Sequence, residues 1–206
     1  MNYLSVDGIS KSYGIKTLFS DVTFGIEKGD KTALIASNGS GKSTLLKILV
    51  GKESADTGTV TFANDIRVGY LEQLPKYDPE LNIQDIIDQA AREHSVATME
   101  DLETCSYEQR LIQMLTRFEL NDLEQKIGNL SGGQVKRLAL AIVLLDNPDL
   151  LILDEPLHGL DNYNRRLVKD IIETFCQRPG KTLIIVTHYQ EELPAVIDHA
   201  ITLQRH

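Results

Sequence analysis

The chain has 206 residues, enough to bury a sizeable hydrophobic core in one domain, with room for a subdomain. Hydrophobic residues make up 42% of the chain and charged residues 25%, which is ordinary for a soluble globular protein. The longest uncharged apolar stretch, 138–145, is far shorter than the ~20 residues that span a bilayer. The N-terminus lacks the basic and apolar segments of a signal peptide, so we expect neither a membrane span nor secretion.

The net charge of −9 is unevenly distributed. Residues 75–130 hold five Lys or Arg residues against twelve Asp or Glu residues, which indicates a solvated helical face and argues against nucleic-acid binding there. Cys105 and Cys176 are far apart, so we expect reduced thiols in a cytoplasmic protein. The five His residues are scattered, and no Cys/His metal site is predicted.

Over residues 1–30, apolar and polar residues alternate in short pieces separated by glycines, a pattern typical of short antiparallel strands. A more continuous apolar run then leads into a glycine-rich turn, as a buried parallel strand would. We predict strands over 3–6, 16–19, 22–26, 31–36, 59–62 and 67–71, and a helix from 41 to about 51.

After Gln73, two prolines interrupt the chain, and Asn82 can cap a helix running to Ala90. A second helix is predicted from apolar residues at helical spacing over 111–118, a stripe more typical of core than of a cofactor site. Residues 78–128 therefore form a predicted α-helical subdomain. The rest of the single domain, 1–77 and 129–206, would be an α/β core with an antiparallel β-subdomain.

The buried-strand pattern resumes at 150–153 and 183–186, with a helix over 165–175 between them. Strand, helix and strand in this order predict a parallel sheet. The expected fold class is thus α/β, with a parallel core sheet.

The stretch 34–49, LIASNGSGKSTLLKIL, has the layout of a phosphate-binding loop, although Ala36 stands where the motif has its first glycine. Backbone N–H groups of such a turn converge on phosphate oxygens at a helix N-terminus. The Lys42 ammonium would reach the β- and γ-phosphates, and the Ser43 hydroxyl would ligate Mg²⁺. The candidate binding residues are Asn38, Gly39, Ser40, Gly41, Lys42, Ser43 and Thr44. The alternative is a glycine-rich turn that binds nothing.

Two further motifs bear on this interpretation. An apolar strand ends in Asp154 and Glu155, where Asp154 suits the shell of a nucleotide-bound Mg²⁺ and Glu155 suits a general base or orienter for water. Ser131, Gly132, Gly133 and Gln134 open another helix and form a second anion site without a lysine.

These residues resemble, over essentially the whole chain, the ATP-binding cassette (ABC) superfamily, whose LSGGQ signature is matched letter for letter at 130–134. The resemblance implies a P-loop NTPase fold. The resemblance implies that Tyr13 stacks on adenine, and that Gln73 touches Mg²⁺ and couples the helical subdomain to the γ-phosphate. It also implies that Asp161 is the D-loop aspartate and His188 the switch histidine at the γ-phosphate. Taken alone, Tyr13 and His188 would be ordinary strand-associated residues.

In this family the phosphate loop of one cassette faces the signature of another, so the resemblance implies a homodimer or a second cassette as partner. The leading hypothesis is an Mg²⁺-dependent, cytoplasmic ATPase in which Lys42, Glu155 and His188 are catalytic and closure of the sandwich is the catalytic event. One alternative is a module that ATP assembles, with slow or vestigial hydrolysis. The other is the energy-coupling subunit of a membrane transporter.

Within the superfamily, the first part of the chain resembles soluble ABC-F cassettes, some of which also carry Ala at the first loop position. The run from Asp154 to Asp161, DEPLHGLD, departs from that group and, with THYQEELP at 187–194, looks more like molybdate-associated tandem cassettes. Both groups join two cassettes, so a single one is half of a tandem protein, a stand-alone subunit or a fragment. Cassette motifs indicate that ATP is hydrolysed but not which solute is transported. Neither a solute nor a membrane or ribosomal partner can therefore be named.

Overall fold

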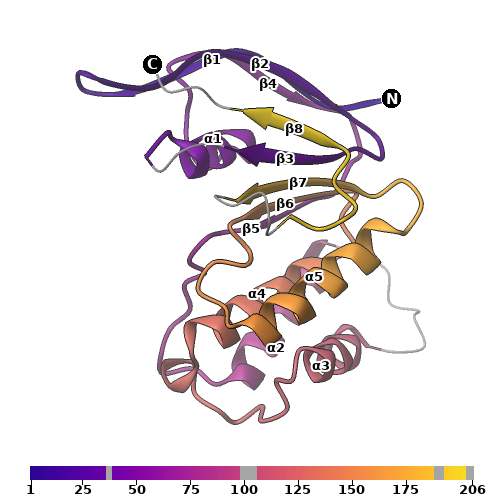
Figure 1. Ribbon diagram of the computed structural model, residues 1–206. Helices are drawn as coiled ribbons and strands as arrows, with labels where there is room; N and C mark the ends of the chain where they lie inside the picture. Colours follow the sequence, from indigo (N-terminus) through magenta and orange to yellow (C-terminus); the bar gives the residue numbers. More distant parts are fainter. Residues whose placement is uncertain (36–38, 98–105, 188–192, 203–206) are drawn as a thin grey trace. The chain divides into compact units, whose positions relative to one another are not determined.

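The computed structural model describes residues 1–35, 39–97, 106–187 and 193–202 (Figure 1). Eight strands and five α-helices occur in these ranges, together with one short 3-10 turn, η1, over Ile127–Asn129. The strands are β1 (Asn2–Tyr13), β2 (Lys16–Glu27), β3 (Lys31–Ile35), β4 (Thr57–Phe62), β5 (Val68–Leu71), β6 (Leu150–Asp154), β7 (Thr182–Thr187) and β8 (His199–Thr202). The α-helices are α1 (Lys42–Leu49), α2 (Ile83–Ala97), α3 (Tyr107–Arg117), α4 (Gly132–Leu145) and α5 (Asn162–Cys176).

The chain divides into two compact units. The first, which we call the sheet unit, comprises Met1–Gln73, Pro148–His158 and Lys169–His206. The second, the helical unit, comprises Leu74–Asn147 and Gly159–Val168. Helix α5 therefore begins in the helical unit and ends in the sheet unit.

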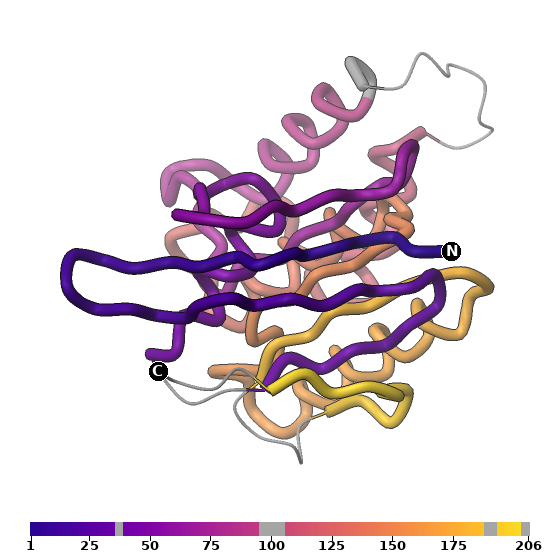
Figure 2. The backbone as a smooth tube through the Cα atoms, turned by 90° about the horizontal axis from the view of Figure 1, so that it is seen from above, coloured from indigo at the N-terminus to yellow at the C-terminus, as the bar shows by residue number. Residues whose placement is uncertain are grey.

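The sheet unit contains an antiparallel sheet of three strands in the order β2-β1-β4, which lie side by side in Figure 2. Strands β1 and β2 are each 12 residues long, whereas the sequence pattern predicts three short pieces over 3–6, 16–19 and 22–26. The difference arises because Gly8 and Asp21, both with left-handed φ, lie within the strands where the register shifts. These residues mark bulges in a continuous hairpin.

The second sheet of this unit has five strands in the order β5-β6-β7-β3-β8, and all of its pairs are parallel. The prediction of an α/β fold with a parallel core sheet and an antiparallel β-subdomain is confirmed. Strand β8 was not predicted, because its four residues at the sheet edge show no buried apolar run. The predicted strands over 59–62 and 67–71 correspond to β4 and β5, which are separated by a turn at Asn64–Asp65 and join different sheets.

One hydrophobic core joins the two sheets of the sheet unit through α1, which lies between them in Figure 1. Helix α1 contributes Leu45, Leu46, Ile48 and Leu49, all of them buried, to a cluster that includes side chains of β1, β2, β3, β6 and β7. Apolar residues surround most of this short helix, so packing on both sides holds it in place. The N-terminus of α1 is thereby tied to both sheets.

The helical unit is built on α2, α3 and α4, with α3 packed against both other helices. The predicted apolar stripe of α3 is buried at Leu111, Leu115 and Phe118. Helix α2 begins at Ile83 as predicted, after Asn82 accepts a hydrogen bond from the N–H of Asp85, and it continues to Ala97 rather than Ala90. A bridge between Asn82 and Lys126 ties the entry to α2 to the segment before η1.

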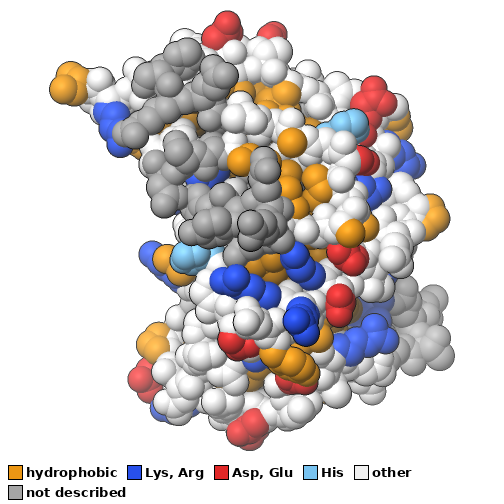
Figure 3. Space-filling model, viewed as in Figure 1, with side chains coloured by type: hydrophobic (Ala, Val, Ile, Leu, Met, Phe, Trp, Pro, Cys, Tyr) orange, Lys and Arg blue, Asp and Glu red, His pale blue; other side chains and the backbone are white. Residues whose placement is uncertain are grey.

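Within the described residues, none of the helices combines the length and the apolar character that crossing a membrane requires. On the face of the molecule in Figure 3, acidic and basic side chains are interspersed over the surface.

Candidate functional site

The phosphate-loop sequence lies in the sheet unit, where β3 ends and α1 begins. Gly41 caps α1 in a left-handed conformation with φ of 90°, and its carbonyl oxygen accepts a hydrogen bond of 2.7 Å from the N–H of Leu45. No acidic residue lies in the first turn of α1. The positive end of the helix dipole is therefore not neutralised by a side chain of the first turn. Such a helix N-terminus is suited to binding an anion.

Lys42 is the first residue of α1 and is only 5% exposed. Burial lowers the pKa of its ammonium group, while the nearby charges of Glu155 and Asp154 act in the opposite direction. The hydroxyl of Ser40, one residue before the cap, is also buried, and among the described residues it has no hydrogen-bond partner. A buried hydroxyl without a partner is rare in folded proteins, and a ligand oxygen at this loop would satisfy it.

The two predicted carboxylates follow β6 in the same unit and are both buried, Asp154 at 1% and Glu155 at 5% exposed. The side-chain amide of Gln73, 82 residues earlier, donates a hydrogen bond of 2.7 Å to Oε2 of Glu155. The structure thus places Gln73, which was predicted to contact Mg²⁺, in hydrogen-bond contact with Glu155, the predicted base. His158, which was not a predicted site residue, lies with its Nδ1 4.0 Å from the same oxygen.

The backbone at Glu155 adopts a left-handed φ of 47°, which is uncommon for a residue other than glycine. Its N–H donates to the carbonyl of Val186 at 3.1 Å, and its carbonyl accepts from the N–H of His158 at 3.2 Å. A residue held in a sparsely populated conformation by several bonds is typical of a functional position.

Tyr13 lies at the end of β1 with 53% of its surface exposed. Its hydroxyl donates to the carboxylate of Glu53 and also contacts the side chain of Thr44 in α1. The hydrogen bond to Glu53 is the main reason that the pKa of this phenol is raised. The ring is therefore held near the phosphate loop with much of its surface open, as stacking on a base requires.

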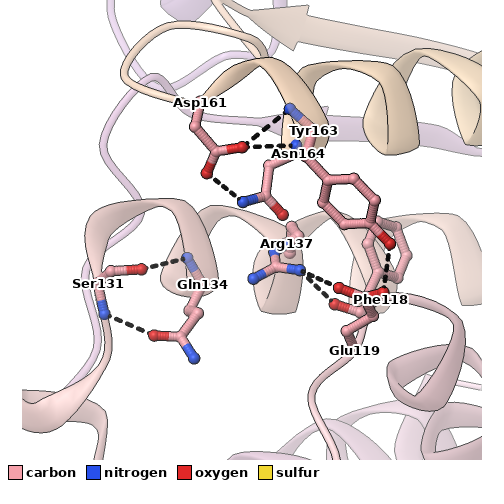
Figure 4. Close-up of polar contacts among 8 residues, drawn as sticks. All are labelled: Phe118, Glu119, Ser131, Gln134, Arg137, Asp161, Tyr163 and Asn164. Atoms are coloured by element: carbon pink, nitrogen blue, oxygen red, sulfur yellow. Dashed lines mark hydrogen bonds and ion pairs between the residues drawn. The ribbon is translucent and has the colours of Figure 1, made fainter.

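The signature residues lie in the helical unit, at the N-terminus of α4 (Figure 4). Ser131 and Gln134 form a capping box, in which Ser131 Oγ accepts from the N–H of Gln134 at 3.2 Å and Gln134 Oε1 accepts from the N–H of Ser131 at 2.9 Å. A Cβ added at Gly132 would meet nothing within 4 Å, whereas one at Gly133 would lie 2.9 Å from Cδ2 of Leu160. Gly133 is thus needed for close packing, and Gly132 leaves the helix end open.

Asp161, the predicted D-loop residue, also lies in the helical unit, directly before α5. Its Oδ1 accepts hydrogen bonds of 2.9 Å from the N–H groups of both Tyr163 and Asn164, and its Oδ2 accepts from the side-chain amide of Asn164. These bonds, first of all those from Asn164, lower the pKa of the Asp161 carboxyl. In the structure Asp161 therefore acts as a helix cap.

Two predicted site residues, Asn38 and His188, lie outside the described residues. The remaining ones fall into two groups. The sheet unit holds Tyr13, Gly39, Ser40, Gly41, Lys42, Ser43, Thr44, Gln73, Asp154 and Glu155, and the helical unit holds Ser131, Gly132, Gly133, Gln134 and Asp161.

Sequence reasoning did not find the side chains that support these residues. Glu53 binds the Tyr13 hydroxyl, and Leu160 packs on Gly133. Glu119, Arg137 and Tyr163 form a polar network beside Asp161. No motif marks any of them, because each contact joins residues that are distant in the sequence.

Comparison with known proteins gives a consistent result. The family model described as ABC transporter matches residues 19–158. Nod factor export ATP-binding protein I of Bradyrhizobium diazoefficiens is 30% identical over 99% of this chain and 69% of its own length. The uncharacterized ABC transporter ATP-binding protein YfmR of Bacillus subtilis is 31% identical over 100% of this chain and 37% of its own. The chain thus spans only part of the length of either relative.

Solved structures agree with this family. The ATP binding subunit of an ABC transporter is 25% identical, with a TM-score of 0.82 over 98% of this chain and 85% of that one. A dimeric ATP-binding cassette in a post-hydrolysis state, bound to ADP and Pi, has a TM-score of 0.83 over 98% and 94% of the two chains and shares the fold at 22% identity. By its motifs, its fold and these relatives, the chain belongs to the ABC transporter family, as an ATPase cassette.

Proposed function

We propose that this cassette binds ATP together with Mg²⁺ and hydrolyses it at the interface of a head-to-tail dimer. The observation that carries the proposal is the grouping in one unit of a buried lysine at a helix N-terminus with two buried carboxylates and a glutamine bonded to one of them. Phosphoryl transfer depends mainly on such positioning and charge stabilisation.

In this proposal the phosphates lie against the N-terminus of α1. Lys42 supplies a positive charge, and burial strengthens its interaction with an anion because solvent screens that interaction only weakly. The Ser40 hydroxyl and the amides from Gly39 to Thr44 complete the cradle, to which Asn38, the preceding residue in the sequence, would also belong. Tyr13 provides the exposed ring on which the adenine stacks.

The donor set fits Mg²⁺. This ion prefers oxygen ligands, keeps several waters, and is usually held by one or two carboxylates together with substrate phosphates. Asp154 offers the carboxylate, Ser43 the hydroxyl and Gln73 the amide oxygen, and all three belong to the sheet unit. When bound, Mg²⁺ would neutralise negative charge on the phosphates.

Glu155 is the proposed general base. Its carboxylate accepts a hydrogen bond from the side-chain amide of Gln73, which orients the Glu155 side chain before a water molecule binds. His188 comes directly after β7 in the sequence, which supports a second contact to the γ-phosphate. Ser131, Gly132 and Gly133 of a second chain would approach the same phosphate, with Gln134 fixing the conformation of Ser131 and Asp161 facing the partner.

The relatives are ATP-binding proteins of transporters by name, which favours an energy-coupling subunit on the cytoplasmic side of a membrane over a stand-alone assembly module. The comparisons give no support to the resemblance to ABC-F or molybdate-associated tandem cassettes, since neither group is named among these relatives.

Steady-state ATP hydrolysis tests the catalytic part of the proposal. Lys42→Ala should abolish nucleotide binding, and Glu155→Gln should bind ATP but lower kcat by about a hundredfold or more, the usual loss when a general base is removed. Both effects are measured as phosphate release and as binding of a fluorescent ATP analogue.

Matched substitutions in the sheet unit serve as controls. Lys181 is another buried lysine, which donates to the carbonyl of Pro148 at 2.8 Å, and Glu173 accepts from the N–H of Ala195 at 2.9 Å. Lys181→Ala should lower the melting temperature, and Glu173→Gln should leave it nearly unchanged, with nucleotide binding retained in both. Turnover that survives in both Lys42→Ala and Glu155→Gln would contradict the assignment.

A further inference from the structure

The segment that carries Asp161 is short, and its conformation is set locally. Both oxygens of the Asp161 carboxylate are used by Tyr163 and Asn164, in the first turn of α5 (Figure 4). The carboxylate is thus locked to that turn. Where Asp161 lies therefore depends on what holds the start of α5 in the helical unit.

Tyr163 provides one such anchor. Its ring is 61% exposed, yet its hydroxyl donates a hydrogen bond of 2.5 Å to Oε1 of Glu119. Glu119 follows the end of α3 and has a left-handed φ of 58°. Figure 4 shows the ring reaching from α5 toward this residue. A largely exposed aromatic ring adds little stability through burial. The hydrogen bond of the hydroxyl is therefore the more specific interaction between Tyr163 and the rest of the helical unit.

Arg137 connects this contact to α4. It is 6% exposed, and its Nη1 donates to the carbonyl oxygen of Phe118 at 2.7 Å and lies 3.9 Å from Oε2 of Glu119. Burial lowers the pKa of its guanidinium, and the nearby Glu119, Asp161 and Tyr163 act in the opposite direction. Because arginine keeps its charge, the Glu119 carboxylate is held at a fixed positive centre on the signature helix.

A second connection joins the same two elements. Leu160, beside Asp161, packs so closely on α4 that a Cβ at Gly133 would lie 2.9 Å from its Cδ2. An apolar contact at one end and a polar network at the other thus fix the Asp161 segment against the helix that Ser131 begins.

We propose that Tyr163 is a positioning residue. Through Glu119 and Arg137, it holds the Asp161 segment in a fixed position relative to the N-terminus of α4. The two segments then meet a partner cassette as one rigid piece. This inference rests on the proposed head-to-tail dimer, because only in that dimer would both segments contact the partner cassette. Tyr163 itself touches no nucleotide in this account.

The chain offers a matched control. The hydroxyl of Tyr107, in α3, donates to Oδ1 of Asp146 at 3.1 Å, at the opposite end of α4. Tyr107→Phe and Tyr163→Phe therefore each remove one phenol hydroxyl bonded to an acidic side chain in the helical unit. Only Tyr163→Phe releases the Asp161 segment.

Two measurements test the proposal. In the nucleotide-free chain, hydrogen exchange of the backbone amides over 159–168 should be faster in Tyr163→Phe and unchanged in Tyr107→Phe. In the Glu155→Gln background with ATP and Mg²⁺, sedimentation should show a dimer dissociation constant raised roughly five- to tenfold by Tyr163→Phe, the range for coupling between contacting groups. The affinity for ATP and the melting temperature should match those of Tyr107→Phe.

Glu119 provides an independent variant. Glu119→Ala should reproduce the effect of Tyr163→Phe, and combining the two should add little, because both break the same contact. Unchanged exchange over 159–168, or an equal loss of dimer in Tyr107→Phe, would overturn the inference. If Glu155→Gln alone stays monomeric with ATP, the proposed dimer fails, and the exchange measurement still decides whether Tyr163 fixes this segment.

Discussion

Gly41 is the residue on which the geometry of the phosphate loop depends most directly. Its φ of 90° lies in the left-handed region, and a Cβ there would come within 3.0 Å of Cβ of Leu18 and Cδ1 of Phe19. Phe19 is almost fully buried in the core that holds α1, so it has little room to move. Both the backbone conformation and the packing therefore require glycine at the cap of α1.

We expect Gly41→Ala to destabilise the fold by more than the about 1–2 kcal/mol that left-handed strain costs alone, and to weaken ATP binding by displacing the loop. Gly14→Ala is the matched control, because Gly14 has a φ of 60° but nothing within 4 Å of its added Cβ. Chemical denaturation and nucleotide binding check both variants. Equal losses of stability in the two, with ATP affinity preserved in Gly41→Ala, would contradict this explanation.

Glu155, the proposed general base, is held in place at both its backbone and its side chain. Its left-handed backbone is held by hydrogen bonds to Val186 and His158, and its side chain by Gln73. Because Gln73 is the last residue of the sheet unit before the helical unit begins, the contact lies where the chain passes between the units. In our proposal, loss of this contact would change the orientation of the base.

Among the helices, α3 and α4 begin with the same device. Ser106 and Gln109 form a capping box at the start of α3, as Ser131 and Gln134 do at the start of α4. A capping box satisfies two N–H groups that the helix leaves unpaired. The two helices differ in the residues directly after the cap, because Gly132 and Gly133 leave little side-chain volume at the start of α4.

Ser131→Ala and Ser106→Ala should therefore each cost about 1 kcal/mol of stability, the usual effect of losing a cap. Only Ser131→Ala should also lower ATP turnover, because α4 is proposed to contact a nucleotide and α3 is not. Thermal unfolding and phosphate release measured on both variants separate the two effects. A similar loss of turnover in Ser106→Ala would show that capping alone is responsible.

The elements that the sequence predicts well are those whose pattern reflects burial. Strands β3, β6 and β7 are continuous apolar runs, and α3 has its buried side chains at helical spacing. Strand β8 lacks such a pattern, and the bulges of β1 and β2 look like turns in the sequence. A local pattern does not distinguish a residue that bends a strand from one that ends it.

The same distinction applies to the candidate site. Lys42, Asp154 and Glu155 could be grouped in advance because the carboxyl ends of parallel strands share one edge of a sheet. The contact of Tyr163 with Glu119 could not, since it joins residues 44 positions apart that belong to no motif. Supporting contacts of this kind depend on tertiary packing.

At the scale of the whole molecule, the candidate residues are divided between the two units. The phosphate loop and the carboxylates belong to the sheet unit, and the signature and Asp161 belong to the helical unit. In the proposed dimer, each ATP is held by the sheet unit of one chain and the helical unit of another. In this proposal a working site takes its two halves from different chains.

Mixing two inactive variants tests this claim most directly. Lys42→Ala inactivates the phosphate loop, and Ser131→Arg places a bulky side chain at the signature. If the site is shared between chains, a heterodimer of the two keeps one intact site, and an equal mixture should recover up to roughly a quarter of wild-type ATP turnover. If each chain holds a complete site of its own, no chain in the mixture is intact, and turnover that stays at the level of the separate variants would contradict the account.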